Sequence, residues 1–254
     1  MPLPTRTARR DRPAAPAEVA PPLAVDALSL TERRALGDQL YPIFSESYGA
    51  LSYDVVCDEI IFRRGGDLFL IHQDGELVGF AVKTVESIAH QGRTVNIFEG
   101  GIYVRRGVSG VGLAWMPHAF KACLREKLRN PLRPQYYVME ALTPVSYRRG
   151  ARSFPRLYPH RSRATPSKLA GLLRAVLAHR GLRRSGDHPF VVRYPDPATH
   201  AEPQRILLNE RLRDDPDVRF YLAHNPGFQD GDILAAIIPL NFTELAIGLL
   251  TRSA

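Results

Sequence analysis

The sequence has little cysteine, little lysine and no apolar run that could cross a membrane uninterrupted. Its two cysteines, Cys57 and Cys123, stand far apart and lack metal-type spacing, which argues against a disulfide scaffold and for a reducing compartment. The longest apolar stretch, 233–250, is broken by Pro239 and Asn241. With 254 residues and a hydrophobic fraction of 44%, the chain can bury a full core, and we expect a cytoplasmic protein without a membrane segment.

Histidines show no metal-binding pattern either. The eight histidines include no His-x-x-x-His pair and stand beside no carboxylate cluster, so a metal site would need distant residues to meet. We predict no metal.

Positive charge is the strongest compositional bias. The formal net charge is +8, and almost all of the 34 basic residues are arginines, a bias that a GC-rich genome produces as readily as phosphate binding does. The densest basic stretch, from Arg148 to Arg163, interleaves Tyr147, Phe154 and Tyr158. It could bind nucleic acid by phosphate contact and stacking or dock an acidic acyl carrier protein, but a solvated helix face is the interpretation that we favour.

The chain divides into three parts by composition. Residues 1–25 are rich in proline, alanine and arginine without hydrophobic periodicity, which predicts a disordered tail. Residues 26–164 form the expected core, and residues 165–254 complete or extend the same domain. The core opens on a helix capped by the Ser29 to Glu32 segment, with Leu36, Leu40, Ile43 and Phe44 on one face.

Three antiparallel strands are expected next. Two apolar runs, 67–72 and 77–82, flank Asp74-Gly75, a strong hairpin signal, and a third strand at 94–104 follows a turn around Gln91-Gly92. Gly100-Gly101 interrupts the third strand, where glycine marks a bulge or a close backbone approach.

The stretch from Arg105 to Gly112 is a basic, glycine-rich turn between that strand and a predicted helix at 113–128. Unpaired N–H groups and the positive helix end converge at such a turn, so it can hold an anion such as a pyrophosphate. The spacing fits neither a Walker motif nor the Rossmann order, and an ordinary loop stays open. So does a helix start near Pro117, which would move the helix end away from the turn.

A further strand and helix follow, and then a less familiar C-terminal third. Residues 135–140 predict a strand, and Thr143-Pro144 begins a helix. Beyond them we expect a helix at 166–180, strands at 190–194 and 218–222, and a helical segment near 204–212.

This order resembles the GNAT superfamily of acetyl-CoA-dependent N-acyltransferases over residues 31–154. The superfamily's Gln/Arg-x-x-Gly-x-Gly/Ala signature lies between a central strand and a helix; Gly110 and Gly112 match its two small positions, and Gly107 occupies its Gln/Arg position. The resemblance implies an α/β (α+β) fold with a mixed, mostly antiparallel sheet flanked by helices. It also implies that strands 94–104 and 135–141 splay apart, helped by a bulge, to admit coenzyme A.

The same resemblance implies a co-substrate and its contacts. Acetyl-CoA or another acyl-CoA would donate an acyl group directly to a small-molecule or peptide amine, without a metal. The expected coenzyme-binding residues are Ile102, Tyr103, Val104, Arg105, Arg106, Gly107, Val108, Ser109, Gly110, Val111 and Gly112.

Acyl transfer to an amine needs a proton acceptor, and a proton donor for the thiolate. Glu99 is the leading base because apolar neighbours would raise its pKa; an exposed carboxylate paired with arginine is the alternative. Glu140 is the reserve base. In the superfamily, a tyrosine from the helix after the fifth strand often acts as the general acid that protonates the thiolate. The resemblance therefore indicates Tyr147, with Tyr158 as the alternative.

Two other functions stay open at this point. One is a catalytically silent binding protein on the same scaffold, possibly for nucleic acid, and the other is an N-acyltransferase that takes its acyl group from a carrier protein. A homodimer is also possible.

Overall fold

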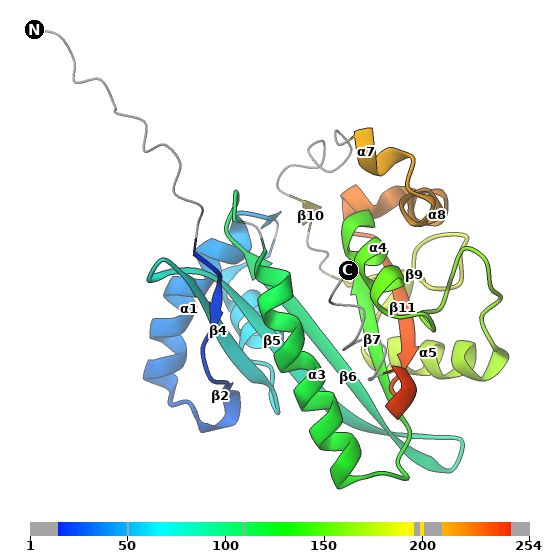
Figure 1. Cartoon of the computed structure of the whole chain (residues 1–254), viewed down its shortest axis with the longest axis horizontal. Coiled ribbons are helices and arrows are strands. Elements are labelled where there is room, and N and C mark those ends of the chain that lie inside the picture. Colours follow the sequence, from blue (N-terminus) through cyan, green and yellow to red (C-terminus); the bar gives the residue numbers. More distant parts are fainter. Residues whose placement is uncertain (1–14, 50, 109, 196–198, 201–209, 245–254) are drawn as a thin grey trace, which may run out of the picture.

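The structure is a computed structural model that describes residues 15–49, 51–108, 110–195, 199–200 and 210–244. Its main sheet has the strand order β1-β4-β5-β6-β7-β11-β9-β8, with β2 also paired to β4 (Figure 1). All neighbours are antiparallel except β6 and β7, which are parallel. The predicted α/β (α+β) class, with a mixed and mostly antiparallel sheet, is confirmed.

The strands have the following bounds: β1 Glu18–Val19, β2 Leu23–Ala24, β4 Asp67–Gln73, β5 Glu76–His90, β6 Arg93–Val104, β7 Gln135–Ala141, β8 Arg183–Arg184, β9 Val191–Arg193 and β11 Ile233–Pro239. A separate two-stranded sheet joins β3 Tyr48–Gly49 to β10 Thr199–His200. The strands of the C-terminal third, β8, β9 and β11, therefore extend the sheet of the core.

Both predicted hairpins are present. Asp74 and Gly75 connect β4 to β5 with φ angles of 53° and 82°, and Gln91 and Gly92 connect β5 to β6 with φ angles of 50° and 73°. Two-residue hairpin turns with positive φ at both positions match the twist of the strands, and Asp-Gly and Gln-Gly can both adopt them.

The predicted bulge at Gly100-Gly101 is wrong. β5 and β6 pair in unbroken register from Gly79 opposite Val104 to His90 opposite Arg93. The alternative, a close approach, is what the glycines provide, because a Cβ on Gly100 would lie 3.1 Å from the Val82 carbonyl oxygen. Glycine at position 100 therefore allows β5 and β6 to approach closely, and it does not change their register.

The helices cover both faces of the sheet (Figure 1). They are α1 Leu30–Ser45, α2 Tyr53–Val55, α3 Val111–Arg129, α4 Pro144–Ser153, α5 Ser167–His179, α7 Glu210–Arg213 and α8 Pro216–His224, with a π-helical turn η2 at Val56–Ile61 and 3-10 turns η1 at Val25–Ala27 and η3 at Pro226–Asp230. α1 begins with the predicted capping box and buries Leu40, Ile43 and Phe44 against β4 and β5, as expected. α3 packs on the opposite face, where Trp115 contacts Phe69.

Two predicted segments differ from the structure. Part of the expected disordered tail, Glu18–Ala24, forms β1 and β2 on the edge of β4, while residues 1–14 lie outside the described residues. The expected strand at 218–222 is instead helix α8. Asp215 caps it and Pro216 occupies its first position, and these start signals override the strand-forming side chains that follow. Of the helical segment expected near 204–212, residues 204–209 lie outside the described residues, and α7 covers the rest.

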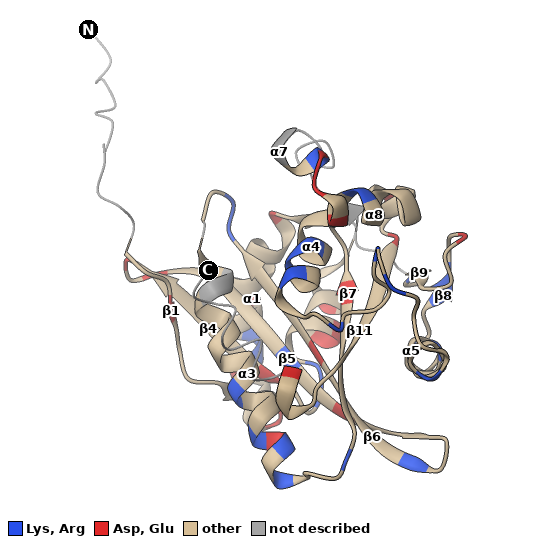
Figure 2. Ribbon diagram, turned by 45° about the vertical axis from the view of Figure 1, so that its right-hand side comes forward, with Lys and Arg blue, Asp and Glu red and all other residues tan. Residues whose placement is uncertain are grey.

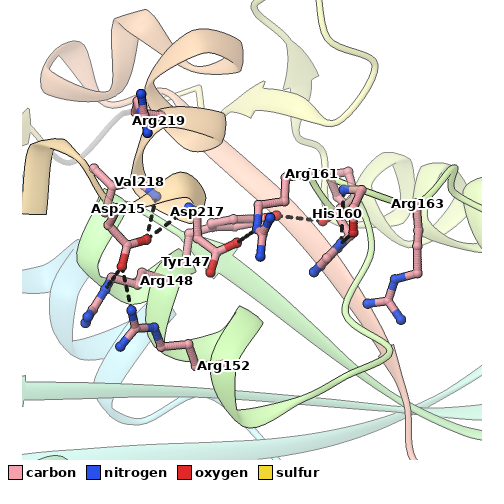
Figure 3. A network of polar contacts seen from close by, with 12 residues as sticks. Tyr147, Arg148, Arg152, His160, Arg161, Arg163, Asp215, Asp217, Val218 and Arg219 are labelled. Carbon is pink, nitrogen blue, oxygen red and sulfur yellow. Dashed lines mark hydrogen bonds and ion pairs between the residues drawn. The ribbon is translucent and has the colours of Figure 1, made fainter.

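Most arginines of the basic stretch 148–163 form ion pairs with carboxylates of the same chain. Arg148 Nε and Arg152 Nη2 both donate to Asp215 Oδ2, at 2.6 and 2.7 Å, and Arg161 Nε donates to Asp217 Oδ1 at 2.8 Å (Figure 3). Figure 2 shows the same pattern at lower magnification, with the basic segments of α4 next to the acidic start of α8. Arg148 and Arg152 therefore join α4 to the start of α8, and Arg161 joins the segment after α4 to the same helix.

Asp215→Ala is expected to lower the free energy of unfolding by about 2 to 4 kcal/mol, since it removes a helix cap and leaves two arginines without their carboxylate. Burial alone would raise the pKa of Asp215, but the Arg148 guanidinium and the N–H groups of Asp217 and Val218 outweigh burial and lower it. The stabilisation is therefore complete above the unfolded value of about 3.9 and is lost as pH falls through the lower folded value.

Urea unfolding from pH 7 down to pH 3 tests this prediction. Asp214→Ala is the matched control, because the Asp214 carboxylate is next in the chain but exposed, and it makes no hydrogen bond or ion pair with the described residues. Equal stability of the Asp215 and Asp214 variants at pH 7 would contradict the prediction.

Candidate active site

The parallel pair β6 and β7 separates after three residue pairs. Asn96, Ile97 and Phe98 lie opposite Gln135, Tyr136 and Tyr137, and beyond that point β6 pairs only with β5 and β7 only with β11. Figure 1 shows the two strands diverging. The Tyr137 hydroxyl donates to the Gly100 carbonyl oxygen at 3.0 Å across the opening, where a backbone bond would otherwise stand. The predicted splayed pair is therefore present.

A cavity of about 280 Å³ lies in this opening. Its walls come from both strands and from the two helices that follow them, and they are mostly apolar. The lining includes Phe98, Glu99, Gly100, Gly101, Ile102 and Tyr103 of β6; Tyr137, Met139 and Glu140 of β7; Trp115, Met116, Ala119, Phe120 and Cys123 of α3; and Ser146, Arg149, Gly150 and Ser153 of α4. An apolar slot with a few polar groups is typical of a small-molecule site.

The glycine-rich turn meets the start of α3 directly. Gly110 is the residue before the helix, with φ of 79°, and the helix begins at Val111. Pro117 lies inside the helix rather than at its start, so the alternative start near Pro117 is wrong. Gly110 provides no side-chain cap for the first N–H groups of α3, which suits an anion-binding helix end.

The two arginines of the turn are held by α1. Arg105 Nη1 contacts Glu46 Oε1 at 2.8 Å, and the Arg106 backbone N–H donates to Glu46 Oε2 at 2.8 Å. Arg106 Nε donates to the Glu46 carbonyl oxygen at 2.7 Å. These arginines therefore fasten the turn to the end of α1, and the backbone of the turn is the better candidate for gripping an anion.

The other predicted coenzyme contacts lie in the cavity wall, in an apolar cluster and in the turn itself. Ile102 and Tyr103 line the cavity, and Tyr103 stacks on Phe80 with ring centroids 4.9 Å apart. Val104, Val108 and Val111 pack in the apolar cluster between α3 and the sheet. Gly107 has φ of 82°, Ser109 lies outside the described residues, and Gly112 is in the first turn of α3.

Glu99 lines the cavity and is paired with two arginines. Its Oε2 lies 2.6 Å from Arg63 Nη1 and 3.0 Å from Arg180 Nη2, and its side chain is 19% exposed. Two guanidinium groups therefore hold the Glu99 carboxylate. Glu99 is thus paired with arginine, as in the alternative, but it lines the cavity and is not on an exposed face, so its role as the base stays a prediction.

Glu140 also lines the cavity and is held by different donors. Arg180 Nη1 lies 3.0 Å from Glu140 Oε1, and the Tyr194 hydroxyl donates to Glu140 Oε2 at 2.7 Å. Burial and the nearby Glu99 charge raise the pKa of Glu140 to about 6, while Arg180 and Tyr194 act in the opposite direction. A carboxylate with this pKa suits a general base near neutral pH.

Tyr147 does not reach the cavity, so its predicted role as the acid is not supported by its position. It is fully buried on another face of α4, where its hydroxyl donates to the Pro159 carbonyl oxygen at 2.8 Å and its ring stacks on Phe220. Tyr158 is not among the lining residues either; its ring lies beneath Arg163.

The face of α4 that meets the cavity carries Ser146, Arg149, Gly150 and Ser153. These residues have helical spacing, so the sequence held the signal, but only the position of β7 shows which face points inward. Arg149 makes no hydrogen bond or ion pair within the part of the chain that the structure describes. Arg180 and Tyr194 were missed because no local pattern connects them to the two strands.

No helix among the described residues is long and apolar enough to cross a membrane. No group of three or more His, Cys, Asp or Glu side chains among them could hold a metal ion.

Three of the solved structures similar to this chain are named as acyltransferases. A probable N-acyltransferase from Enterococcus faecalis is 13% identical, with a TM-score of 0.38, and the match covers 54% of this chain but only 32% of that protein's length. A ribosomal-protein-alanine N-acetyltransferase from Brucella melitensis is 18% identical, with a TM-score of 0.30, over 48% of this chain and 78% of the other. An aminoglycoside acetyltransferase in complex with coenzyme A is 11% identical, with a TM-score of 0.34, over 91% and 97%. No protein-family model and no curated protein matches the chain.

Proposed function

We propose that this protein is a GNAT-like N-acyltransferase that moves an acyl group, most simply acetyl, from coenzyme A directly to an amine. The observation that carries the proposal is the cavity between the separated strands β6 and β7, lined by two carboxylates. The acceptor would be a small-molecule or peptide amine, and the setting cytoplasmic.

The donor would be held at two places. Backbone N–H groups of the turn from Gly107 to Gly112 and of the first turn of α3 would bind the pyrophosphate, since these groups are suited to an anion. The apolar cavity would take the arm that ends in the thioester, and Arg149 offers a cation along its α4 wall.

The reaction needs one group that accepts the proton lost by the amine and then passes it to the thiolate. The amine nitrogen attacks the thioester carbonyl carbon, the carbon–sulfur bond breaks, and the sulfur leaves with the electron pair as a thiolate. The nitrogen loses a proton, which we assign to the Glu140 carboxylate and then to the thiolate. Glu140 is preferred to Glu99 because Glu99 is held by two guanidinium groups and Glu140 by one.

The nucleic-acid alternative loses its main support in this structure. Arg148, Arg152 and Arg161, which made the basic stretch a candidate, are paired with Asp215 and Asp217. Two carboxylates thus offset two of these three positive charges, and phosphate contact would have to compete with the ion pairs.

Calorimetry and a thiol-release assay test the proposal together. We expect the full chain to bind acetyl-CoA and coenzyme A, and to release free thiol from acetyl-CoA when a panel of amines is added, including an aminoglycoside, a polyamine and a short peptide with a free N-terminus. Salt-sensitive binding of a DNA duplex without any affinity for acetyl-CoA would overturn the proposal in favour of a nucleic-acid-binding protein.

Gly110→Ala is expected to weaken acetyl-CoA binding by roughly 5- to 30-fold, because alanine at φ of 79° costs about 1 to 2 kcal/mol. Alanine would relax the turn in the free protein, and binding would then have to restore the strained backbone.

Gly92→Ala is the matched control for this effect. Gly92 has φ of 73° in the hairpin at the opposite end of β6, and a Cβ there would meet no atom within 4 Å, as at Gly110. Calorimetry of both variants separates coenzyme binding from general backbone strain. Equal acetyl-CoA affinity in the two variants would remove the turn from the binding site.

A further inference from the structure

Arg180 is a buried cation that the C-terminal third of the chain delivers to the opening between β6 and β7. It follows α5, and its side chain is only 4% exposed. Its Nη1 lies 3.0 Å from Glu140 Oε1 and its Nη2 lies 3.0 Å from Glu99 Oε2. One guanidinium group therefore joins carboxylates from two strands that no longer share backbone hydrogen bonds.

The position of Arg180 is fixed by the way α5 ends. Gly181 has φ of 71°, its N–H donates to the Ala178 carbonyl oxygen, and the Leu182 N–H donates to the Leu177 carbonyl oxygen. This pair of bonds is a Schellman motif, and Leu177 and Leu182, the residues whose apolar side chains usually accompany it, are both buried in the main apolar core. The backbone that carries Arg180 is therefore held by local bonds and by burial, which lowers the entropy lost when the guanidinium binds both carboxylates.

Tyr194 is a second contact from the same part of the chain. It follows β9, and its hydroxyl donates to Glu140 Oε2 at 2.7 Å. Burial and the Glu140 charge raise the pKa of Tyr194, so its hydroxyl stays protonated at neutral pH. Each oxygen of Glu140 thus has one donor, and both donors come from residues beyond 164.

We infer that Arg180 and Tyr194 are positioning residues of the acyl transfer, which hold the Glu140 carboxylate in the opening through one contact to each of its oxygens. The inference rests on the proposed function. It also gives the C-terminal third of the chain a role in the reaction centre as well as in extending the sheet.

The charges around Glu140 predict the direction in which each substitution should shift the pKa of this carboxylate. The groups that face it are Glu99 and Tyr103 of β6, Tyr137 of β7, Arg63 after η2, Arg180 after α5 and Tyr194 after β9, while β11 places Ala235 opposite it. Burial and Glu99 raise the pKa of Glu140, and Arg180 and Tyr194 lower it. Loss of Arg180 or Tyr194 should raise this pKa, and loss of Glu99 should lower it.

Carboxyl titration in the unliganded full chain, with ¹³C-labelled glutamate followed by NMR, measures this pKa without any acceptor. Glu140→Gln identifies the signal. Arg180→Met is expected to move the Glu140 titration up by about 1 to 3 pH units, the usual effect of an adjacent arginine. Tyr194→Phe should move it upward by less and Glu99→Gln downward, and the acid limb of kcat/KM for thiol release should move with each.

Two further variants separate positioning from a structural brace. Arg180→Lys keeps the charge but cannot span both carboxylates as a guanidinium does, so its shift should lie between those of wild type and Arg180→Met. Arg174→Met, on the exposed face of α5, is the matched control and should shift nothing.

An unchanged Glu140 titration in Arg180→Met and Tyr194→Phe, with only the unfolding midpoint lowered, would overturn the inference and leave Arg180 as a brace. If Arg180→Met does not fold, the shifts in Tyr194→Phe and Arg180→Lys decide the matter. Failure of the proposed function has a different signature, namely no thiol release by the wild-type protein with any amine while the carboxyl shifts still occur.

Discussion

Glu140→Gln is expected to lower the turnover of acyl transfer by about 10²- to 10⁴-fold, the usual contribution of a general acid–base group. Glutamine keeps the shape of the side chain, and its carbonyl oxygen can accept from Arg180 while its NH2 group donates to the Tyr194 oxygen, but it cannot take a proton from the amine. Calorimetry of acetyl-CoA should show binding close to that of the wild type, because the proton acceptor is needed only after the donor is bound.

The pH profile gives the same prediction a second readout. The pKa of Glu140 is raised to about 6, so kcat/KM of the wild type should rise with pH through about that value and then level off as the carboxylate ionises. The residual activity of Glu140→Gln should lack this limb.

Glu99→Gln should lose less activity and keep the limb, displaced to lower pH, since removal of the Glu99 charge lowers the pKa of Glu140. Glu76→Gln, at an exposed position at the start of β5, is the neutral control. Full turnover by Glu140→Gln across neutral pH would remove Glu140 from the reaction and return Glu99 as the candidate.

Ala119→Trp is expected to weaken acetyl-CoA binding on the order of 100-fold or more, about 2.8 kcal/mol. Ala119 lies on the wall of the cavity that α3 supplies, and an indole there would occupy space that the donor needs.

Ala122→Trp is the matched control for the cavity prediction. Ala122 lies on the same helix with similar partial burial, but it lines a different groove beside His118, Lys121 and Arg125. Calorimetry of acetyl-CoA, with circular dichroism to confirm the helix content of both variants, distinguishes a filled cavity from a disturbed helix. Undiminished binding in Ala119→Trp would place the donor somewhere other than this cavity.

Local signals in the sequence were sufficient for the elements of the core. The Ser29–Glu32 capping box started α1, and the Asp74-Gly75 and Gln91-Gly92 turns joined three strands, because each depends on residues within four positions of one another. The glycine turn and the start of α3 were likewise read from adjacent residues. Competing local signals caused the error at 218–222, where the Asp215-Pro216 start outweighed strand-forming side chains.

Which residues meet in the opening between β6 and β7 was decided by the tertiary structure. Arg180 is 40 residues from Glu140 and 81 residues from Glu99 along the chain, Tyr194 is 54 residues from Glu140, and no local pattern links them. They meet because β7 pairs with β6 over only three residues, and because α5 packs against β11 and β9 pairs with β11, the strand next to β7. The phase of α4 was decided in the same way: helical spacing defines possible faces, but packing against β7 turned Ser146 and Arg149 to the cavity and buried Tyr147 elsewhere. Turns and caps depend on neighbouring residues and can be read from the chain, whereas a reaction centre built across separated strands depends on contacts between distant segments that only the folded protein brings together.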